Sequence, residues 1–430
     1  SADTENAPII AFTPKDLDLS AVDPKSPLWA LLNRDISVRA CALNPEGPHL
    51  FAANQAARAS ANRREWAELE AEGADASPYV VNGGVSYGVA YESAPKDEPE
   101  DIRVPMLMKS QWSQGNVGTS PCYNYFTPNN YVCGCVATAM SQLMRYHEWP
   151  HSTTQITRQC SWAGVQSTKM KLRTQAGDFD WANMPLTAAD VTDDEQRQAI
   201  GKLTSDAGIS VYMMYNDIGE DGQPGGESGA FSFDIPDALK SVWGYGSAIR
   251  FSAGKDSITA TTPQKRAKAM KGVLFANFDA GLPVLMGISG QGGHQIVADG
   301  YGFDEDEVDY VHLNMGWSGQ SDMWYNLPDM KDAGFTVVDD VVYNVMTNGT
   351  DSTAIVSGRV TDETGAGVSK AAVTVLSGTK VVAKALTSET GVWGVPVSIV
   401  GDKATYSIRV DSPDGMRYGT IEKSAVKRPQ

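Results

Sequence analysis

Positive charge is scarce in this sequence of 430 residues, where 35 Lys and Arg stand against 52 Asp and Glu and give a net charge of −17. A nucleic-acid groove or an anionic membrane surface requires concentrated Lys and Arg. The composition therefore argues against both as partners. No apolar run reaches the length of a transmembrane helix, so membrane insertion is not expected. No signal peptide is recognisable either, although a chain starting at Ser1-Ala2 is compatible with a processed exported protein.

Cysteine is also rare, with only five in the chain. Five are too few for a disulfide-stapled scaffold of this size, and the odd number leaves at least one thiol free. Cys41, Cys122, Cys133 and Cys160 have no pairing that the sequence determines, and Cys122 and Cys133 could pair with each other or with Cys160. Cys133 and Cys135 are separated by one residue, whereas structural zinc sites prefer two to four. We expect no metal and no other cofactor.

The first 102 residues differ in character from the rest. Residues 27–43 and 47–72 have helical patterns, and residues 79–91 read as two short strands around an Asn-Gly-Gly turn. Residues 92–101, ESAPKDEPED, are acidic and contain two prolines. Such a segment cannot bury enough apolar surface to order itself. The sequence therefore predicts an α/β segment over 1–102 that ends in an exposed, protease-accessible linker.

Two further domains follow. Residues 103–350 alternate helical and strand-like stretches, interrupted by a glycine-rich insertion at 216–229 that reads as a mobile loop. Residues 351–430 show period-two alternation broken by Gly, Asp and Ser turns, which predicts a small antiparallel β-sandwich of about seven strands. The predicted fold class is α+β.

Cys135 stands where a buried helix is predicted to begin. The apolar residues from there to Tyr146 share one helical face. Free backbone N–H groups and the helix dipole in the first turn favour a thiolate. Gly134 allows a sharp turn and a close approach of a substrate. The alternative is a small buried thiol that starts a core helix, and this stretch alone favours that alternative.

A nucleophilic cysteine needs a base, a group that holds the base, and oxyanion donors. His294 follows two glycines at the start of an apolar strand, 159 residues after Cys135, an interval close to that of papain-type enzymes. Asn314 could accept a hydrogen bond from the imidazole and hold its tautomer, and Trp317 could shield that bond from water. Gln114 could donate to the oxyanion together with the backbone N–H of Cys135.

These stretches resemble the streptopain family of secreted bacterial cysteine peptidases, which have a papain-like fold. The matching segments are QGN at 114–116, YN at 123–124, GCVATAMSQLMRYHEWP at 134–150, FDW at 179–181, DAGISV at 206–211, GGHQIVADGY at 292–301 and HLNMGWSG at 312–319. They cover essentially all of residues 105–330 in the family's order. The family usually reads N-W-G-W where this chain has Met315 in place of the first tryptophan.

The resemblance implies that Cys135 is the nucleophile, His294 the general base and acid, and Gln114 an oxyanion donor, with Asn314 and Trp317 in the segment that supports the histidine. Gly134, Gly293 and Trp317 are the residues we expect at the bound substrate.

The resemblance also implies a zymogen: residues 1–102 would be a propeptide, 103–350 a papain-like catalytic domain and 351–430 an accessory sandwich. Removal of the propeptide near Arg103, by another protease or by the chain itself, would yield a secreted or cell-surface endopeptidase. The partners expected are peptide and protein substrates. A hydrophobic side chain next to the cleaved residue is the preference that the family implies. The oligomeric state is left open.

Two other functions are compatible with the same residues. One is a catalytically silent protein whose sandwich attaches to a surface glycan or protein. The other is a Cys-His amidase or acyltransferase acting on cell-wall peptides, because acyl transfer and hydrolysis differ only in the acceptor that the site admits.

Overall fold

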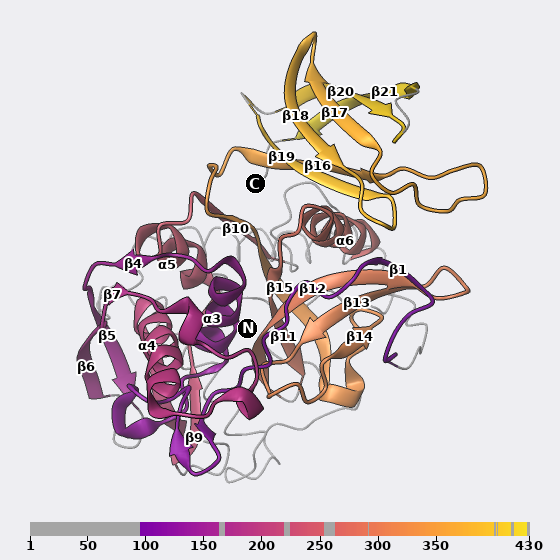
Figure 1. Ribbon diagram of the computed structural model, residues 1–430. Coiled ribbons are helices and arrows are strands. Elements are labelled where there is room, and N and C mark those ends of the chain that lie inside the picture. Colours follow the sequence, from indigo (N-terminus) through magenta and orange to yellow (C-terminus); the bar gives the residue numbers. More distant parts are fainter. Residues whose placement is uncertain are drawn as a thin grey trace, which may run out of the picture.

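The computed structural model describes residues 95–162, 168–218, 224–252, 263–290, 292–399, 401, 403–413 and 417–427 (Figure 1). The expected helices and hairpin of residues 1–94, and Cys41, lie outside the described residues. The described helices are α3 (Cys135–His147), α4 (Asp194–Ser210), α5 (Ile235–Ser241) and α6 (Pro263–Asp279), with short 3-10 turns η3 (Pro128–Asn130), η4 (Trp181–Asn183), η5 (Ala188–Asp190), η6 (Ser232–Asp234) and η7 (Lys331–Ala333).

The largest sheet has seven strands, six of them in one path. Its spatial order is β10 (Ser247–Ser252), β15 (Phe335–Met346), β11 (Val284–Gly290), β12 (Gly293–Phe303), β13 (Asp309–Asn314) and β14 (Met323–Tyr325), and β1 (Asp101–Val104) also pairs with β12. All of these pairs are antiparallel. Side chains alternate between the two faces: Val297 joins the core cluster built around α3, whereas Ile296 and Ala298 join the cluster that includes α6.

A second, four-stranded sheet lies beside α4. Its order is β6 (Thr168–Arg173), β5 (Thr157–Trp162), β8 (Met214–Ile218) and β9 (Pro224–Gly229), and two short pairs accompany it, β2 (Asn116–Val117) with β3 (Ser120–Pro121) and β4 (Ser152–Thr153) with β7 (Gly177–Asp178). The prediction of a loop over 216–229 is wrong for its described ends, because β8 and β9 form an antiparallel pair there. Backbone hydrogen bonds to a neighbouring strand outweighed the glycine-rich composition.

Helix α3 lies between the large sheet and helix α4. It packs against α4 on one side and against β12 of the large sheet on the other. Its residues from Val136 to Met144 are buried, and Glu148 ends it in the left-handed conformation. Asp193 caps the start of helix α4, because its carboxylate accepts from the backbone N–H of Gln196 at 2.9 Å. Because α3 runs along the junction, its first residue can meet groups from the large sheet.

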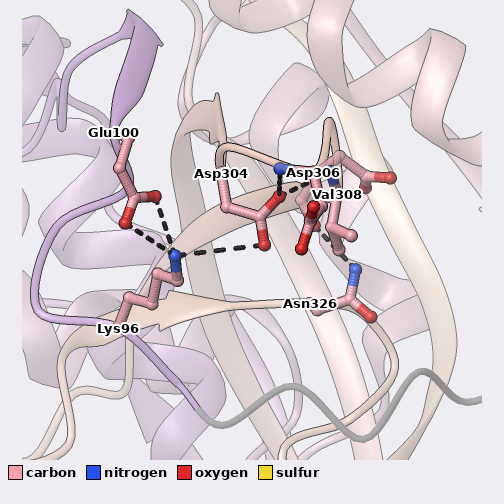
Figure 2. Close-up of polar contacts among 7 residues, drawn as sticks. Lys96, Glu100, Asp304, Asp306, Val308 and Asn326 are labelled. Carbon is pink, nitrogen blue, oxygen red and sulfur yellow. Dashed lines mark hydrogen bonds and ion pairs between the residues drawn. The ribbon is translucent and has the colours of Figure 1, made fainter.

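The described part of the expected linker, residues 95–101, is attached to the large sheet. Lys96 exchanges two backbone hydrogen bonds with Trp324, of 2.9 and 3.1 Å. Its amine contacts the carboxylates of Glu100 at 2.7 Å and Asp304 at 3.9 Å (Figure 2). Pro99 is buried close to Gly302. The predicted exposure is confirmed at Asp97, Glu98 and Glu100. The expectation that the segment does not order itself is wrong, because Lys96 offsets the acidic charges and neighbouring strands offer backbone partners. Strand β1 also runs across the predicted boundary at 102/103.

The C-terminal strands form two antiparallel sheets that share one core. The first consists of β16 (Thr353–Arg359) and β19 (Val392–Ser398), and the second of β18 (Lys380–Leu386), β17 (Ala372–Ser377), β20 (Lys403–Asp411) and β21 (Arg417–Lys427). Six strands are described, against about seven predicted. In Figure 1 this unit sits against α6. Val392 joins the α6 core cluster, and the Thr390 hydroxyl donates to the carbonyl of Arg103 at 2.6 Å.

Candidate active site

Cys135 is the first residue of α3, as the sequence predicts, and it is partly exposed. Gly134 precedes it at φ 91° and ψ 148°, a conformation open almost only to glycine. A Cβ at this position would lie 2.7 Å from the Met213 sulfur and 2.8 Å from the Ser228 carbonyl oxygen. The glycine is therefore required by contacts within the protein. Met213 and Ser228 fill the space that a side chain would need, and the close approach of a substrate to Gly134 stays a prediction.

The fold brings Cys135 next to the strand that carries His294. The backbone N–H of Gln295 hydrogen-bonds the Cys135 thiol, and Gln295 directly follows His294 on β12. On this strand Gln295 is buried and His294 is half-buried. The start of α3 thus lies against the start of β12, so that Cys135 contacts the residue next to His294, 159 positions further along the sequence.

Three groups hold the imidazole of His294. Its Nε2 lies 2.8 Å from the carbonyl oxygen of Met315. Since a carbonyl can only accept, Nε2 carries the proton, and Nδ1 is left as the nitrogen able to take one. The ring packs against Trp317, with centroids 4.9 Å apart and planes 25° apart, and against Phe335 at 5.6 Å and 14°. Trp317 thus packs on the imidazole itself, whereas it was expected to shield a hydrogen bond from Asn314 to His294. Phe335 was missed, because it comes 41 residues later at the start of β15 and no motif marks it.

Asn314 does not hold the histidine directly, which corrects the expected hydrogen bond. Its Oδ1 accepts from Gln142 Nε2 at 2.8 Å and from the backbone N–H of Gly316 at 3.1 Å, and its Nδ2 donates to the Ser110 carbonyl at 2.7 Å. The side chain of Asn314 is buried beside α3, and the next carbonyl along the chain reaches the imidazole. Asn314 acts on His294 only through the backbone.

Met315 occupies the position where the family usually has tryptophan. Its side chain is fully buried in the core of the large sheet, so it does not line the site. Its backbone N–H donates to Asp322 Oδ1 at 2.7 Å, and burial raises the pKa of Asp322 to about 6. The replacement therefore changes the core beneath the histidine and leaves the carbonyl contact intact.

The main chain of Gln114 adjoins the turn before the nucleophile, because its carbonyl accepts from the N–H of Cys133 at 2.9 Å. Gln114 is half-buried. Gly293 is exposed, and a Cβ there would meet no atom within 4 Å, so this wall of the site is open. The predicted site residues Gln114, Cys135, Gly293 and His294 are thus placed around one location.

The protonation states of Cys135 and His294 differ from the thiolate that the helix start alone predicts. Burial raises the pKa of Cys135 above its ordinary value, against the lowering effect of the N–H groups of Gln295, Val136 and Cys135 itself. Burial also lowers the pKa of His294, against the raising effect of the Met315 carbonyl. Both directions favour a neutral thiol at Cys135 and a neutral imidazole at His294. The prediction of a depressed thiol pKa is wrong because it counted the donors of the helix and not the surrounding protein.

The other described cysteines are free thiols, so none of the pairings considered for Cys122, Cys133 and Cys160 is formed. Burial raises the pKa of each to about 12. They are therefore inert compared with the partly exposed Cys135. Within the described ranges no group of three or more His, Cys, Asp or Glu side chains is arranged to hold a metal ion. None of the helices placed by the structure is both long and apolar enough to cross a bilayer.

Comparison with known proteins confirms the resemblance to streptopain. Residues 112–325 match the Peptidase C10 family. Streptopain of Streptococcus pyogenes is 26% identical over 253 residues, which cover 56% of this chain and 54% of streptopain. The thiol protease/hemagglutinin PrtT of Porphyromonas gingivalis is 28% identical over 190 residues, which cover 44% of this chain and 19% of PrtT. The chain thus spans about half the length of streptopain and about a fifth of PrtT.

One solved structure, that of the active interpain A cysteine protease of Prevotella intermedia, is also similar. It has 22% sequence identity and a TM-score of 0.46, and the match covers 58% of this chain and 98% of interpain A.

Proposed function

We propose that this chain, whose residues 112–325 form a streptopain-like peptidase domain, is a cysteine endopeptidase of papain-like fold. The observation that carries the proposal is the position of Cys135 beside the strand that carries His294. The N–H of Gln295 reaches the thiol, and the neighbouring imidazole is fixed through Nε2 by the Met315 carbonyl. A partly exposed thiol beside an oriented base is the arrangement that nucleophilic catalysis requires.

In the proposed reaction His294 takes the thiol proton at Nδ1 while the Cys135 sulfur attacks the peptide carbonyl. The tetrahedral oxyanion is stabilised by the N–H of Cys135, which has no acceptor within the helix because it lies in the first turn, and by the side chain of Gln114. The C–N bond then breaks, and the imidazolium protonates the leaving amine. A water molecule, deprotonated by His294, hydrolyses the thioester and regenerates the thiol. Each oxyanion donor would lower the barrier by about 3–4 kcal/mol.

The precursor form is part of this proposal. Residues 1–94 would be an inhibitory propeptide that is removed outside the bacterial cell, by the chain itself or by another protease. The attachment of residues 96–104 to β14 and β12 supports a cut upstream of Lys96 in place of the expected cut near Arg103. Cleavage inside β1 would first require its strand pairing to break. Extended peptides with a hydrophobic side chain beside the cleaved residue are the proposed substrates.

No contact in the described residues favours the silent binding protein or the cell-wall amidase over a peptidase. A direct test compares the wild-type chain with Cys135→Ala and His294→Ala on an unstructured protein substrate. We expect cleavage by the wild type alone. Cleavage by Cys135→Ala at the wild-type rate would refute the proposal. Ser141→Ala on the same helix is the matched control, because its buried hydroxyl has no hydrogen-bond partner and lies outside the site.

A further inference from the structure

Gln142 is a fully buried polar residue on the helix that carries the nucleophile. It follows Cys135 by seven residues, which is about 20° short of two complete helical turns, so the two side chains project from the same face of α3. Thr138 lies between them on this face, and its methyl group would be 3.2 Å from a Cβ on Gly316. This face of α3 therefore packs directly against the segment that supports His294.

Both the oxygen and the nitrogen of the Gln142 side-chain amide form hydrogen bonds. Its Oε1 accepts from the backbone N–H of Trp112 at 3.0 Å, two residues before Gln114. Its Nε2 donates to Asn314 Oδ1 at 2.8 Å. One side chain thus joins α3 to the segment that precedes the oxyanion residue and to the end of β13.

The link continues to the imidazole through a single planar peptide group. Asn314 Oδ1 also accepts from the N–H of Gly316, and that N–H belongs to the same peptide unit as the Met315 carbonyl. This carbonyl is the acceptor for His294 Nε2 at 2.8 Å. Fixing the N–H end of the unit fixes the direction of its carbonyl, and with it the angle of the imidazole.

We propose that Gln142 is a positioning residue for the cysteine-peptidase reaction, which couples the nucleophile helix, the Gln114 segment and the carbonyl that orients His294. This inference rests on the proposed function. Gln142 touches neither substrate nor reacting atoms. Its effect is on how well the thiol, the base and the oxyanion donor are aligned when a substrate arrives, and alignment errors of about 1 Å cost on the order of 100-fold in rate.

The substitution Gln142→Glu separates the hydrogen bond with Trp112 from the hydrogen bond with Asn314. The new side chain has the same shape and keeps an oxygen for the N–H of Trp112, but an ionised carboxylate cannot donate to Asn314 Oδ1 and repels it. A protonated carboxyl can donate again. The groups that hydrogen-bond Gln142, the Trp112 backbone and the Asn314 amide, do not titrate. We therefore expect kcat of Gln142→Glu to fall about 10- to 100-fold at pH 8 with KM changed less than about twofold, and to recover toward wild type as the pH falls to 5.

The full chain, after any processing it undergoes, is assayed in two ways: peptide cleavage, and the rate of Cys135 alkylation by iodoacetamide located by mass spectrometry. Ser141→Ala is the control and should match wild type in both, and Gln142→Met should be slow at every pH because it cannot donate at all. Thermal unfolding establishes that each variant is folded.

Wild-type kcat and alkylation rates in a folded Gln142→Glu at pH 8 would overturn the inference, and so would a loss that does not recover with acid. Absence of peptide cleavage by the wild type would refute the proposed function instead. In that case the alkylation rates still decide the role of Gln142.

Discussion

Replacing Gly134 by alanine tests whether the turn before the nucleophile is held by the protein itself. The backbone at φ 91° and ψ 148° is a conformation that costs a residue with a Cβ about 1–3 kcal/mol. The added methyl would also lie 2.7–2.8 Å from Met213 Sδ and Cε and from the Ser228 carbonyl oxygen. The Met213 side chain can move, whereas the backbone oxygen cannot without shifting β9. Overpacking of this kind costs about 1–3 kcal/mol.

The two contributions together predict a loss of about 2–6 kcal/mol in the free energy of unfolding. Substitutions at two other glycines separate the contribution of the backbone conformation from that of the close contacts. Gly118 has φ 63°, and a methyl group added there would have no atom within 4 Å, so Gly118→Ala should lose only about 1–2 kcal/mol. Gly272 is exposed in α6 with open space around it, so Gly272→Ala should gain about 0.5–1 kcal/mol.

Urea unfolding of the three variants, followed by fluorescence, measures these differences. Peptide cleavage by Gly134→Ala should fall as well, because relief of the overlap moves Cys135 relative to His294. A Gly134→Ala variant as stable as Gly118→Ala would refute this expectation, since the contacts with Met213 and Ser228 would then have no energetic effect.

Three more outcomes are expected. Burial raises the pKa of Asp206 to about 6, above its unfolded value near 3.8, so the folded state binds the proton first. Wild type should therefore gain about 2 kcal/mol in unfolding free energy over Asp206→Asn as the pH falls from 7.5 to 4, and an unfolding difference independent of pH would contradict this. Deleting residues 352–430 should lower the melting temperature of the peptidase domain, because Val392 leaves the α6 core; an unchanged melting temperature would show the sandwich to be merely attached. N-terminal sequencing of the processed chain should find a start at or before Lys96, and a start at Arg103 would contradict the attachment of the preceding segment.

Sequence reasoning predicted the helix that begins at Cys135 and the strand that carries His294, because both follow local rules. Gly134 and the apolar face after it predict the start of α3 at Cys135, and the two glycines before His294 predict a strand that begins at an open wall. Such signals depend on the nearest few residues, so no knowledge of the three-dimensional contacts is needed to interpret them.

The errors concern groups that are brought together by the fold. The sequence shows that Asn314 is close to the histidine segment, but not that its amide is taken up by Gln142 from a helix 172 residues earlier. It cannot reveal that a backbone carbonyl orients the imidazole, since every residue has one. Phe335 is one aromatic residue among many until β15 places it against His294.

The predictions of the thiol pKa and of the acidic linker failed for a related reason. Each was judged from its own stretch of chain, whereas the burial of Cys135 and the anchoring of Lys96 depend on strands far away in sequence. Desolvation and strand pairing are tertiary effects, and local composition does not report them.

The most direct test of Cys135 as the nucleophile is mass spectrometry of the chain quenched with acid during turnover of an activated peptide ester. We expect an added acyl group of the substrate's mass on Cys135, which disappears as the substrate is exhausted and is absent in Cys135→Ala. Turnover with no adduct on this thiol, and undiminished in Cys135→Ala, would contradict covalent catalysis by Cys135.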